Sequence, residues 1–318
     1  MDRLVVPVLT ATAAEVIATL ADRPGLAVVA VAVDLSGDGG LDVLREAALI
    51  AGASRCHAID KCEELARGVL WPALRAGALT VPGEPVLTAL SMPVVAEAVV
   101  EISRHERATG VAVWLDDLRD RQRLRALIRD LAPTLGLVGI PMRATIAGTS
   151  TIDSARPTET RNLWARVETP ARTEIAPRPA TNGVAAVRIG FERGVPATLN
   201  GVHMAPGELI RGLTAVVGGQ GAGVWTVQGS ASAASWRVDA PAALALAVAM
   251  DAMASRTLDM RTSEVAATMA EAYAEVIRDG AWFNPVRAGL DAFVDRVLAG
   301  TVGDVELRIV DGQIEVQA

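Results

Sequence analysis

Short, mostly apolar runs alternate with longer amphipathic stretches through the first half of the chain. The apolar runs cover residues 4–9, 26–33, 55–59, 111–115 and 135–140. Between them, apolar side chains recur at helical spacing in residues 13–21, 41–51, 62–76, 94–105 and 120–131. Apolar strands buried on both faces, separated by amphipathic helices, are typical of a parallel sheet wrapped by helices. The pattern therefore predicts an α/β fold with a parallel sheet.

The second half of the chain has a different pattern. Residues 144–182 are rich in Thr, Pro, Ala, Arg and Ser, which indicates a connecting segment. Strand patterns follow at 184–189 and 196–199, and helical patterns at 206–217, 241–255, 262–278 and 285–298. Two further runs, joined by Asp311-Gly312, predict a hairpin over residues 305–316. With 318 residues, the chain is long enough for a second domain, of α+β type.

Charge and hydropathy exclude several classes of partner. The net charge is −7 and no long basic tract is present, so we expect no nucleic-acid partner. The longest uncharged apolar run, residues 240–250, is far shorter than the roughly 20 residues that a membrane span needs. Asp2, Arg3 and Glu15 interrupt the beginning of the chain, which is unlike a signal peptide. We therefore expect a cytoplasmic protein with no membrane partner.

Two cysteines, Cys56 and Cys62, are the only ones in the chain. So few cysteines favour a reducing compartment over a disulfide framework. With His57 they suggest a metal site, but zinc needs four convergent ligands and no partner cluster is visible. We interpret them as buried cysteines beside a surface histidine and expect no metal. No Ser-His-Asp, Cys-His or paired-carboxylate arrangement is visible, so no catalytic residue is assigned.

Two glycine-rich segments, residues 34–42 and 218–221, suggest phosphate-binding loops only weakly. The first follows the second expected strand, where Ser36 or Asp38 can cap the next helix. The second follows an expected helix and fits a C-cap and turn. We interpret both glycine clusters as structural.

The loop after the first expected strand is the usual phosphate site of doubly wound folds, and here it contains no glycine. Thr12 and Glu15 match the S/T-x-x-E capping box, in which the side chains of a helix take its own free N–H groups. Such a cap discourages a bound phosphate at this helix. The mixed charges of residues 116–125 are interpreted as a solvated helix face.

Several segments, in one order along nearly the whole chain, resemble the argininosuccinate synthase family. WPALRAGAL at 71–79, PVLTALSMP at 85–93, NLWAR at 162–166, IGFERGVP at 189–196 and WFNPVR at 282–287 are similar to FPALRANALY, PLATALARP, NLWGR, IGFEKGVP and WFSPLR of that family. The family couples citrulline to aspartate: ATP adenylylates the ureido oxygen, and the aspartate amine displaces AMP. The resemblance thus implies a C–N ligase ancestry.

The resemblance also implies a domain organisation. Residues 1–143 are expected to form a nucleotide-binding-like parallel-sheet domain of the HUP (PP-loop) class, and 144–183 a connecting segment. Residues 184–284 are expected to form a synthetase-type α+β domain, and 285–318 a C-terminal helix and hairpin that act as an oligomerisation arm. The apolar stripe of residues 285–298 at helical spacing also predicts a partner surface, although it could pack on its own domain. We expect a homo-oligomer, a tetramer or a dimer.

Most of the family's functional positions differ in this chain. The SGGLDT pyrophosphate loop aligns with residues 9–14, which contain no serine or glycine. The arginine of ALARP falls on Met92, and the tyrosine before PLAT on Glu84. A glutamate and a tyrosine of the second domain, which hold citrulline in the family, fall on Thr226 and Val238. Glycine is needed where backbone N–H groups must approach a pyrophosphate closely.

Four positions keep the family's residues: Thr88, Asp120, Arg123 and Asn162. We predict that these bind a small amino-acid-like ligand, because an arginine beside an aspartate suits a zwitterion. No cofactor is expected, and ATP is expected not to bind in the family manner. Three hypotheses follow: a pseudoenzyme that serves as a scaffold or regulatory subunit of an enzyme partner, a repurposed enzyme that uses the old cleft, or an authentic citrulline–aspartate ligase. We favour the first.

Overall fold

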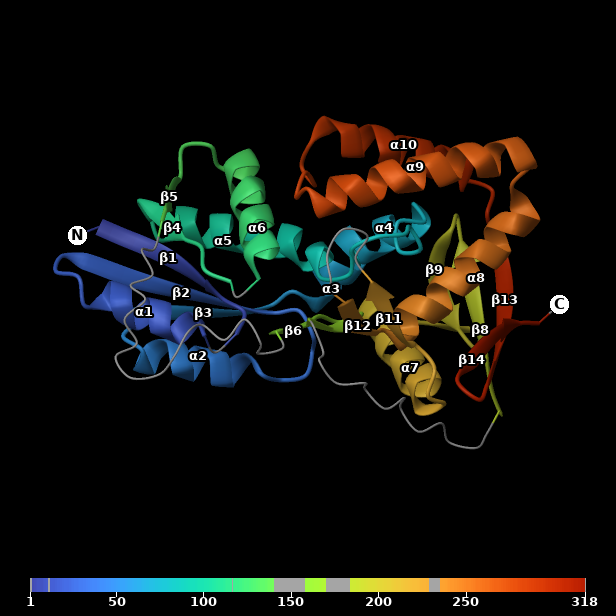
Figure 1. Cartoon of the computed structure of the whole chain (residues 1–318), viewed down its shortest axis with the longest axis horizontal. Helices are drawn as coiled ribbons and strands as arrows, with labels where there is room; N and C mark the ends of the chain where they lie inside the picture. Colours follow the sequence, from blue (N-terminus) through green and yellow to red (C-terminus); the bar gives the residue numbers. More distant parts are fainter. Residues whose placement is uncertain are drawn as a thin grey trace. The chain divides into compact units, whose positions relative to one another are not determined.

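A computed structural model describes residues 2–10, 12–115, 117–139, 158–169, 184–228 and 235–317. The chain forms two compact units (Figure 1). The first contains Met1–Lys61 and Met92–Thr158, and the second contains Cys62–Ser91 and Glu159–Ala318. Residues 62–91 fall within the span expected for the first domain, but they are compact with the second unit. In the described part of the chain, no helix is both long and apolar enough to cross a membrane.

The first unit is built on a five-stranded parallel sheet. Its strands are β1 (Asp2–Val8), β2 (Leu26–Asp34), β3 (Arg55–Asp60), β4 (Gly110–Ala112) and β5 (Gly136–Val138), in the order β3-β2-β1-β4-β5. The expected parallel sheet is therefore confirmed. The order of the strands reverses between β1 and β4, and open sheets bind ligands at the carboxyl ends of the strands beside such a reversal.

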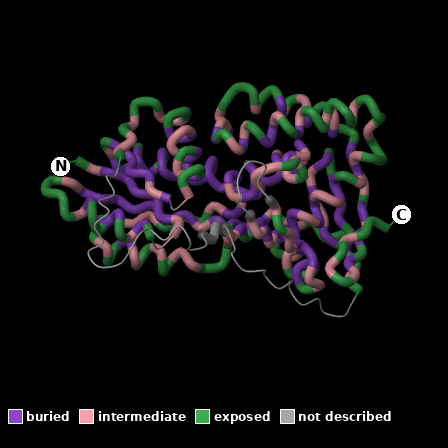
Figure 2. Tube along the Cα trace, in the orientation of Figure 1, coloured by how far each residue is buried: buried purple, intermediate pink, exposed green. Residues whose placement is uncertain are grey.

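Helices cover both faces of this sheet (Figure 1). They are α1 (Ala13–Ala21) and α2 (Leu41–Ile50) on one face and α5 (Met92–His105) and α6 (Leu118–Leu131) on the other. Leu4, Val6 and Val8 of β1 pack in the core under α1, while the intervening Val5 is also fully buried. Figure 2 shows this burial along β1 and β2. Because both faces are covered, the strands read as uninterrupted apolar runs.

The second unit contains two sheets. The larger is antiparallel, with β8 (Val184–Glu192), β9 (Val195–Leu199), β10 (Val202–His203), β13 (Gly303–Val310) and β14 (Gln313–Val316) in the order β10-β9-β8-β13-β14. Helices α7 (Pro206–Gly219) and α8 (Pro241–Thr257) pack on it, against β9 and β13 respectively. Asp311 and Gly312 both have positive φ, at 50° and 78°, as a two-residue hairpin turn requires, so the predicted hairpin is confirmed.

The smaller sheet has the order β11-β12-β7-β6. Its strands are β6 (Thr158–Arg161), β7 (Arg166–Thr169), β11 (Val224–Gln228) and β12 (Ser235–Asp239). The same unit holds a continuous helical stretch made of α3 (Cys62–Leu65), the π-helical turn η1 (Ala66–Leu70) and α4 (Trp71–Arg75), and later the short 3-10 helix η2 (Ala89–Ser91). An antiparallel second domain of mixed α and β structure is thus present, as expected.

The C-terminal apolar stripe packs inside its own unit. Helix α10 (Pro285–Val297) lies against α9 (Met260–Arg278), and Leu290, Val294 and Leu298 are buried. The Tyr273 hydroxyl of α9 donates to Asp291 of α10 at 2.8 Å. Since the stripe finds partners in the same chain, it does not by itself require a second subunit. The homo-oligomer stays a prediction.

A buried carboxylate joins three elements at the amino-terminal side of the first sheet. The Glu106 side chain, directly after α5, is 2% exposed. It accepts a hydrogen bond from Nε2 of His57 at 2.8 Å and pairs with Arg3 at 3.0 Å and Arg55 at 3.3 Å. The hydrogen bond with His57, aided by the two guanidinium groups, holds the pKa of Glu106 below its usual value even though burial opposes this.

We expect Glu106→Gln to lower the free energy of unfolding by about 1–3 kcal/mol near neutral pH, because charge-assisted hydrogen bonds are lost. A depressed folded-state pKa stabilises the fold above the unfolded pKa, and this contribution disappears as pH falls through the folded value. In urea titrations, the difference in unfolding free energy between parent and variant should therefore shrink as the pH falls below the ordinary pKa of a glutamate. Glu101→Gln, at an exposed site on α5, is the matched control and should change stability little. A difference in unfolding free energy between Glu106→Gln and the parent that does not change with pH would contradict this account.

Candidate functional site

The start of α1 follows β1 at the strand-order reversal. Helix α1 begins after Thr12, as expected, but the predicted capping box is wrong, because the Thr12 hydroxyl makes no cap hydrogen bond. It lies 2.7 Å from the Thr10 hydroxyl instead. Thr12 has helical backbone angles, φ −63° and ψ −24°, whereas a capping side chain needs an extended backbone. The N–H groups of Ala13 and Glu15 donate to the carbonyls of Thr10 and Thr12, both at 3.2 Å.

The glycine-rich segment after β2 is organised by a side chain at the end of that strand. Oδ1 of Asp34 accepts from the N–H of Ser36 at 2.8 Å and from the N–H of Gly37 at 2.9 Å. Helix α2 has Gly40 at its N-cap, so neither Ser36 nor Asp38 occupies the cap position, although Oδ1 of Asp38 accepts from the N–H of Gly40 at 3.3 Å. Asp34 thus forms an Asx-type turn, in which the N–H groups of Ser36 and Gly37 are hydrogen-bonded within the loop.

The other glycine cluster ends α7 as predicted. The helix stops at Gly219, Gln220 is the C-cap, and Gly221 has a φ of +77°. This is the left-handed residue that commonly follows a helix, and it confirms the structural interpretation.

The first two turns of α6 bring together two of the four predicted site residues. Asp120 and Arg123 are each 5% exposed, and Nη1 of Arg123 lies 2.8 Å from Oδ1 of Asp120. Asp117 is the N-cap of α6 and accepts from the N–H groups of Arg119 and Asp120. Arg123 is therefore buried, and the prediction of a solvated helix face is wrong at this position. The carboxylate and the guanidinium offer opposite charges at one place.

A contact that the sequence pattern did not predict holds the segment after β4. The guanidinium of Arg121 stacks on the Trp114 ring at 3.8 Å and donates twice to the carbonyl of Leu115, at 3.1 and 2.6 Å. Trp114 also packs against the core under α1. This arginine therefore fixes the chain at the carboxyl end of β4, beside the strand-order reversal. No local signal marks it, because it is one arginine in a mixed charge run.

Asn162 and Thr88, the other two predicted residues, lie in the second unit. Nδ2 of Asn162 donates to the carbonyl of Leu87 at 2.8 Å and to the Ser91 hydroxyl at 3.0 Å. Its Oδ1 accepts from the N–H groups of Trp164 and Ala165, at 3.0 and 2.9 Å. A side-chain amide has two donor hydrogens and two acceptor lone pairs, so these bonds use its full capacity. Asn162 thus shapes the turn that carries the half-buried Thr88.

The binding roles of Thr88, Asp120, Arg123 and Asn162 stay predictions. The structure pairs Asp120 with Arg123 in the first unit and connects Asn162 to the Thr88 turn in the second. Any ligand contact by Asn162 would have to replace one of its present hydrogen bonds.

The two second-domain positions that differ from the family lie on opposite faces of the smaller sheet. Thr226 of β11 is opposite Arg237 of β12, whereas Val238 is opposite Trp225. Neighbouring residues of a strand point to opposite faces, so Thr226 and Val238 cannot share one surface. Val238 is fully buried and Thr226 is exposed.

The cysteine and histidine positions support a simple structural role. Cys62 is buried and Cys56 is half-buried, and burial raises the pKa of the Cys56 thiol. His57 is engaged with Glu106. Among the residues that the structure describes, no three His, Cys, Asp or Glu side chains are arranged to hold a metal ion.

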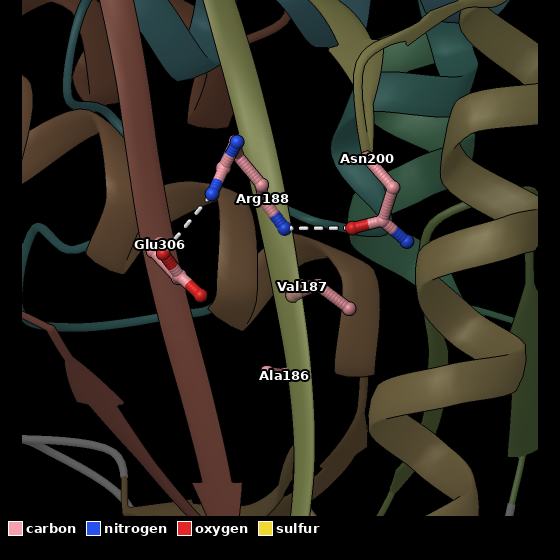
Figure 3. Close-up of a pocket in the computed structure, with 5 residues that line it drawn as sticks. All are labelled: Ala186, Val187, Arg188, Asn200 and Glu306. Atoms are coloured by element: carbon pink, nitrogen blue, oxygen red, sulfur yellow. Dashed lines mark hydrogen bonds and ion pairs between the residues drawn. The ribbon is translucent and has the colours of Figure 1, made fainter.

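A shallow pocket of about 170 Å³ lies on the larger sheet of the second unit (Figure 3). Its charged residues, Arg188 and Glu306, point toward each other and pair at 3.5 Å. The N–H of Arg188 donates to the side chain of Asn200 at 2.9 Å. Typical ligand pockets are larger and more enclosed, roughly 300 Å³ and above, so this hollow is not assigned a ligand.

Comparison with known proteins gives a consistent result over most of the chain. Residues 10–159 match the family model for the arginosuccinate synthase N-terminal HUP domain, and residues 149–318 match that for the arginosuccinate synthase C-terminal domain. Relatives named argininosuccinate synthase include those of Desulforamulus reducens, 29% identical, and Pelotomaculum thermopropionicum, 30% identical. These alignments cover 94% and 92% of this chain and 82% and 81% of the relatives. The protein from Rubrobacter xylanophilus is 31% identical over 88% of this chain and 76% of its own length.

Proposed function

The chain belongs to the argininosuccinate synthase family, and on that premise we propose that it is a pseudoenzyme of this family. In this proposal the chain does not perform ATP-dependent ligation. It acts as a scaffold or regulatory subunit for an enzyme partner and retains a site for a small amino-acid-like ligand. The observation that carries the proposal is the start of α1, where the family's pyrophosphate loop aligns.

A pyrophosphate at a helix N-terminus is held by backbone N–H groups that have no other partner. At the start of α1, by contrast, the N–H groups of Ala13 and Glu15 already donate to backbone carbonyls. In the alignment of SGGLDT with residues 9–14, one family glycine falls on Thr10, whose side chain adds bulk where glycine would leave the backbone bare. Glu15 adds a negative charge to the first turn, which disfavours a further anion. Together these features support the loss of ATP binding.

The positions for the amino-acid substrates support the same proposal. Val238 is fully buried on the apolar face of its sheet, where the family's tyrosine aligns. Asp120 and Arg123 keep the family's residues and are held against each other. A surviving carboxylate–guanidinium pair fits a zwitterionic ligand better than it fits a nucleotide. We therefore propose that the chain still binds a small ligand although it does not catalyse ligation.

A second candidate function is active citrulline–aspartate ligation. It is favoured by the relatives, which are named argininosuccinate synthase and align over most of their length. For this candidate, N–H groups at the start of α1 would have to release their present carbonyl partners when ATP binds. The two candidates therefore differ in a measurable step.

Pyrophosphate release with ATP, magnesium, citrulline and aspartate distinguishes the two candidates. The Desulforamulus reducens synthase, assayed in the same buffer, is the positive control. We expect release by this chain to be lower by a factor of about 10³ or more, since several charge-stabilising groups are missing at once. Calorimetry with ATP and magnesium should detect no binding tighter than about millimolar. Pyrophosphate release within about tenfold of the control would establish the second candidate, and micromolar ATP binding would contradict the proposed loss of ATP binding.

A further inference from the structure

One arginine at the end of α9 holds a loop far away in the sequence. Nε of Arg278 donates to the carbonyl of Glu84 at 3.0 Å, and its Nη2 donates to the carbonyls of Pro82 and Val81 at 3.1 and 3.3 Å. The arginine is half-buried, and all these residues belong to the second unit. A planar guanidinium presents several donors in a fixed fork, which suits a set of carbonyls on one bend of the chain.

The loop itself has no regular hydrogen-bond ladder over residues 81–84. Its backbone carbonyls must therefore find partners outside helices and strands. Gly83 has a φ of +115°, and a Cβ atom there would lie 3.4 Å from Nη2 of Arg278. The guanidinium of Arg278 thus packs closely against the backbone at Gly83, which has no side chain. Removing it would leave three carbonyls without this donor.

The loop leads directly into the turn that carries Thr88. In that turn the N–H of Leu90 donates to the carbonyl of Val86, and the N–H of Ser91 donates to the carbonyl of Thr88, both at 3.1 Å. Asn162 holds the far side of the turn through Leu87 and Ser91. The segment is therefore held before Thr88 by Arg278 and around Thr88 by Asn162.

We propose that Arg278 is a positioning residue for Thr88, acting through the carbonyls of residues 81–84. A single orientation of the guanidinium restrains the loop, and the loop sets where the Thr88 turn begins. The inference rests on the proposed function only in treating Thr88 as a residue that faces a ligand. Its test needs no ligand, so a failure of the pseudoenzyme proposal would leave the result for Arg278 unchanged.

The test compares Arg278→Ala with the parent by two local measurements. Spectra of protein labelled at threonine methyl groups report on Thr88, whose signal is identified by its loss in Thr88→Ser. Amide hydrogen exchange reports on residues 79–91. We expect the Thr88 methyl signal to shift and broaden, and exchange in residues 79–91 to accelerate about tenfold or more, while the rest of the unit changes little. Added guanidinium ion at millimolar concentration should reverse both effects, whereas methylammonium should not.

Matched variants separate positioning from general destabilisation. Arg261→Ala removes an exposed arginine from the other end of α9, where it pairs with the exposed Glu264, and should leave Thr88 unchanged. Arg278→Lys keeps the positive charge but lacks the planar set of guanidinium donors, so its Thr88 signal and exchange rates should lie between those of the parent and Arg278→Ala. If Arg278→Ala does not fold, Gly83→Ala perturbs the same contact from the loop side and should shift the same signals. An unchanged Thr88 signal, equal effects of Arg261→Ala, or uniform acceleration of exchange throughout the unit would overturn the proposal.

Discussion

Asn162→Asp is expected to lower the free energy of unfolding of the second unit by about 3 kcal/mol, although the two side chains have almost the same shape. The substitution replaces the donor Nδ2 by an oxygen that faces the carbonyl of Leu87 at a 2.8 Å contact. Asn162 is 6% exposed, so the new negative charge would be buried beside an acceptor. Urea unfolding followed by tryptophan fluorescence measures the loss, since Trp164 is bonded to Asn162.

The pH dependence gives this prediction a specific signature. A buried carboxyl beside a carbonyl is favoured in its protonated form, which again offers a donor to Leu87. The deficit of Asn162→Asp should therefore shrink as the pH is lowered below about 5. Asn200→Asp is the matched control, because the Asn200 side chain acts as an acceptor for the N–H of Arg188 and a carboxylate keeps that role. Equal stability of the Asn162 variant and the parent would mean that its amide does not hold the turn.

The parallel sheet could be predicted because its determinants are local. Residues of β1 and β2 are mostly apolar since helices cover both faces, and the intervening helices repeat their apolar side chains every three or four residues. The C-terminal hairpin is equally local, because Asp311-Gly312 provides the two positive φ angles of its turn. In these elements, residues close together in the sequence are enough to predict the structure.

The corrections arise where backbone angles or distant partners decide. The sequence at Thr12 fits a capping box, but its helical φ and ψ direct the hydroxyl elsewhere. The apolar stripe of residues 285–298 packs on α9, one of the two possibilities that its spacing left open, and the homo-oligomer stays a prediction. Periodicity identifies which face is apolar and does not identify what lies on it.

The candidate site depended still more on long-range contacts. Asn162 bonds to Leu87 across 75 positions, and Arg278 bonds to Glu84 across 194. Neither pair has a local motif, so the resemblance to a family pointed to Asn162 as a ligand-binding residue, and nothing pointed to Arg278. The structure adds that all four hydrogen-bonding positions of Asn162 are occupied within the protein, while its ligand-binding role stays a prediction.

Gly223→Ala is expected to weaken folding severely, because the added methyl group would collide with backbone. Gly223 lies just before β11 with a φ of +91°, and a Cβ atom there would lie 2.3 Å from Cα and 2.6 Å from N of Pro241. Both are backbone atoms at the start of α8, and the junction is tied further by the N–H of Ala240, which donates to the carbonyl of Gly223 at 2.8 Å. Backbone cannot rotate away as a flexible side chain can.

Substitutions at two other glycines separate the cost of backbone strain from the cost of the steric collision. Gly201 has a φ of +78°, and a Cβ atom there would have no other atom within 4 Å, so Gly201→Ala should cost only the backbone strain of about 1–2 kcal/mol. Gly289, exposed within α10 and with open space around it, should gain about 0.5–1 kcal/mol on replacement by alanine. We expect Gly223→Ala to cost more than about 4 kcal/mol in urea unfolding, or to prevent accumulation of folded protein. A loss no greater than that of Gly201→Ala would show that the start of α8 can move away from β11, and that this junction does not fix the position of β11 against α8.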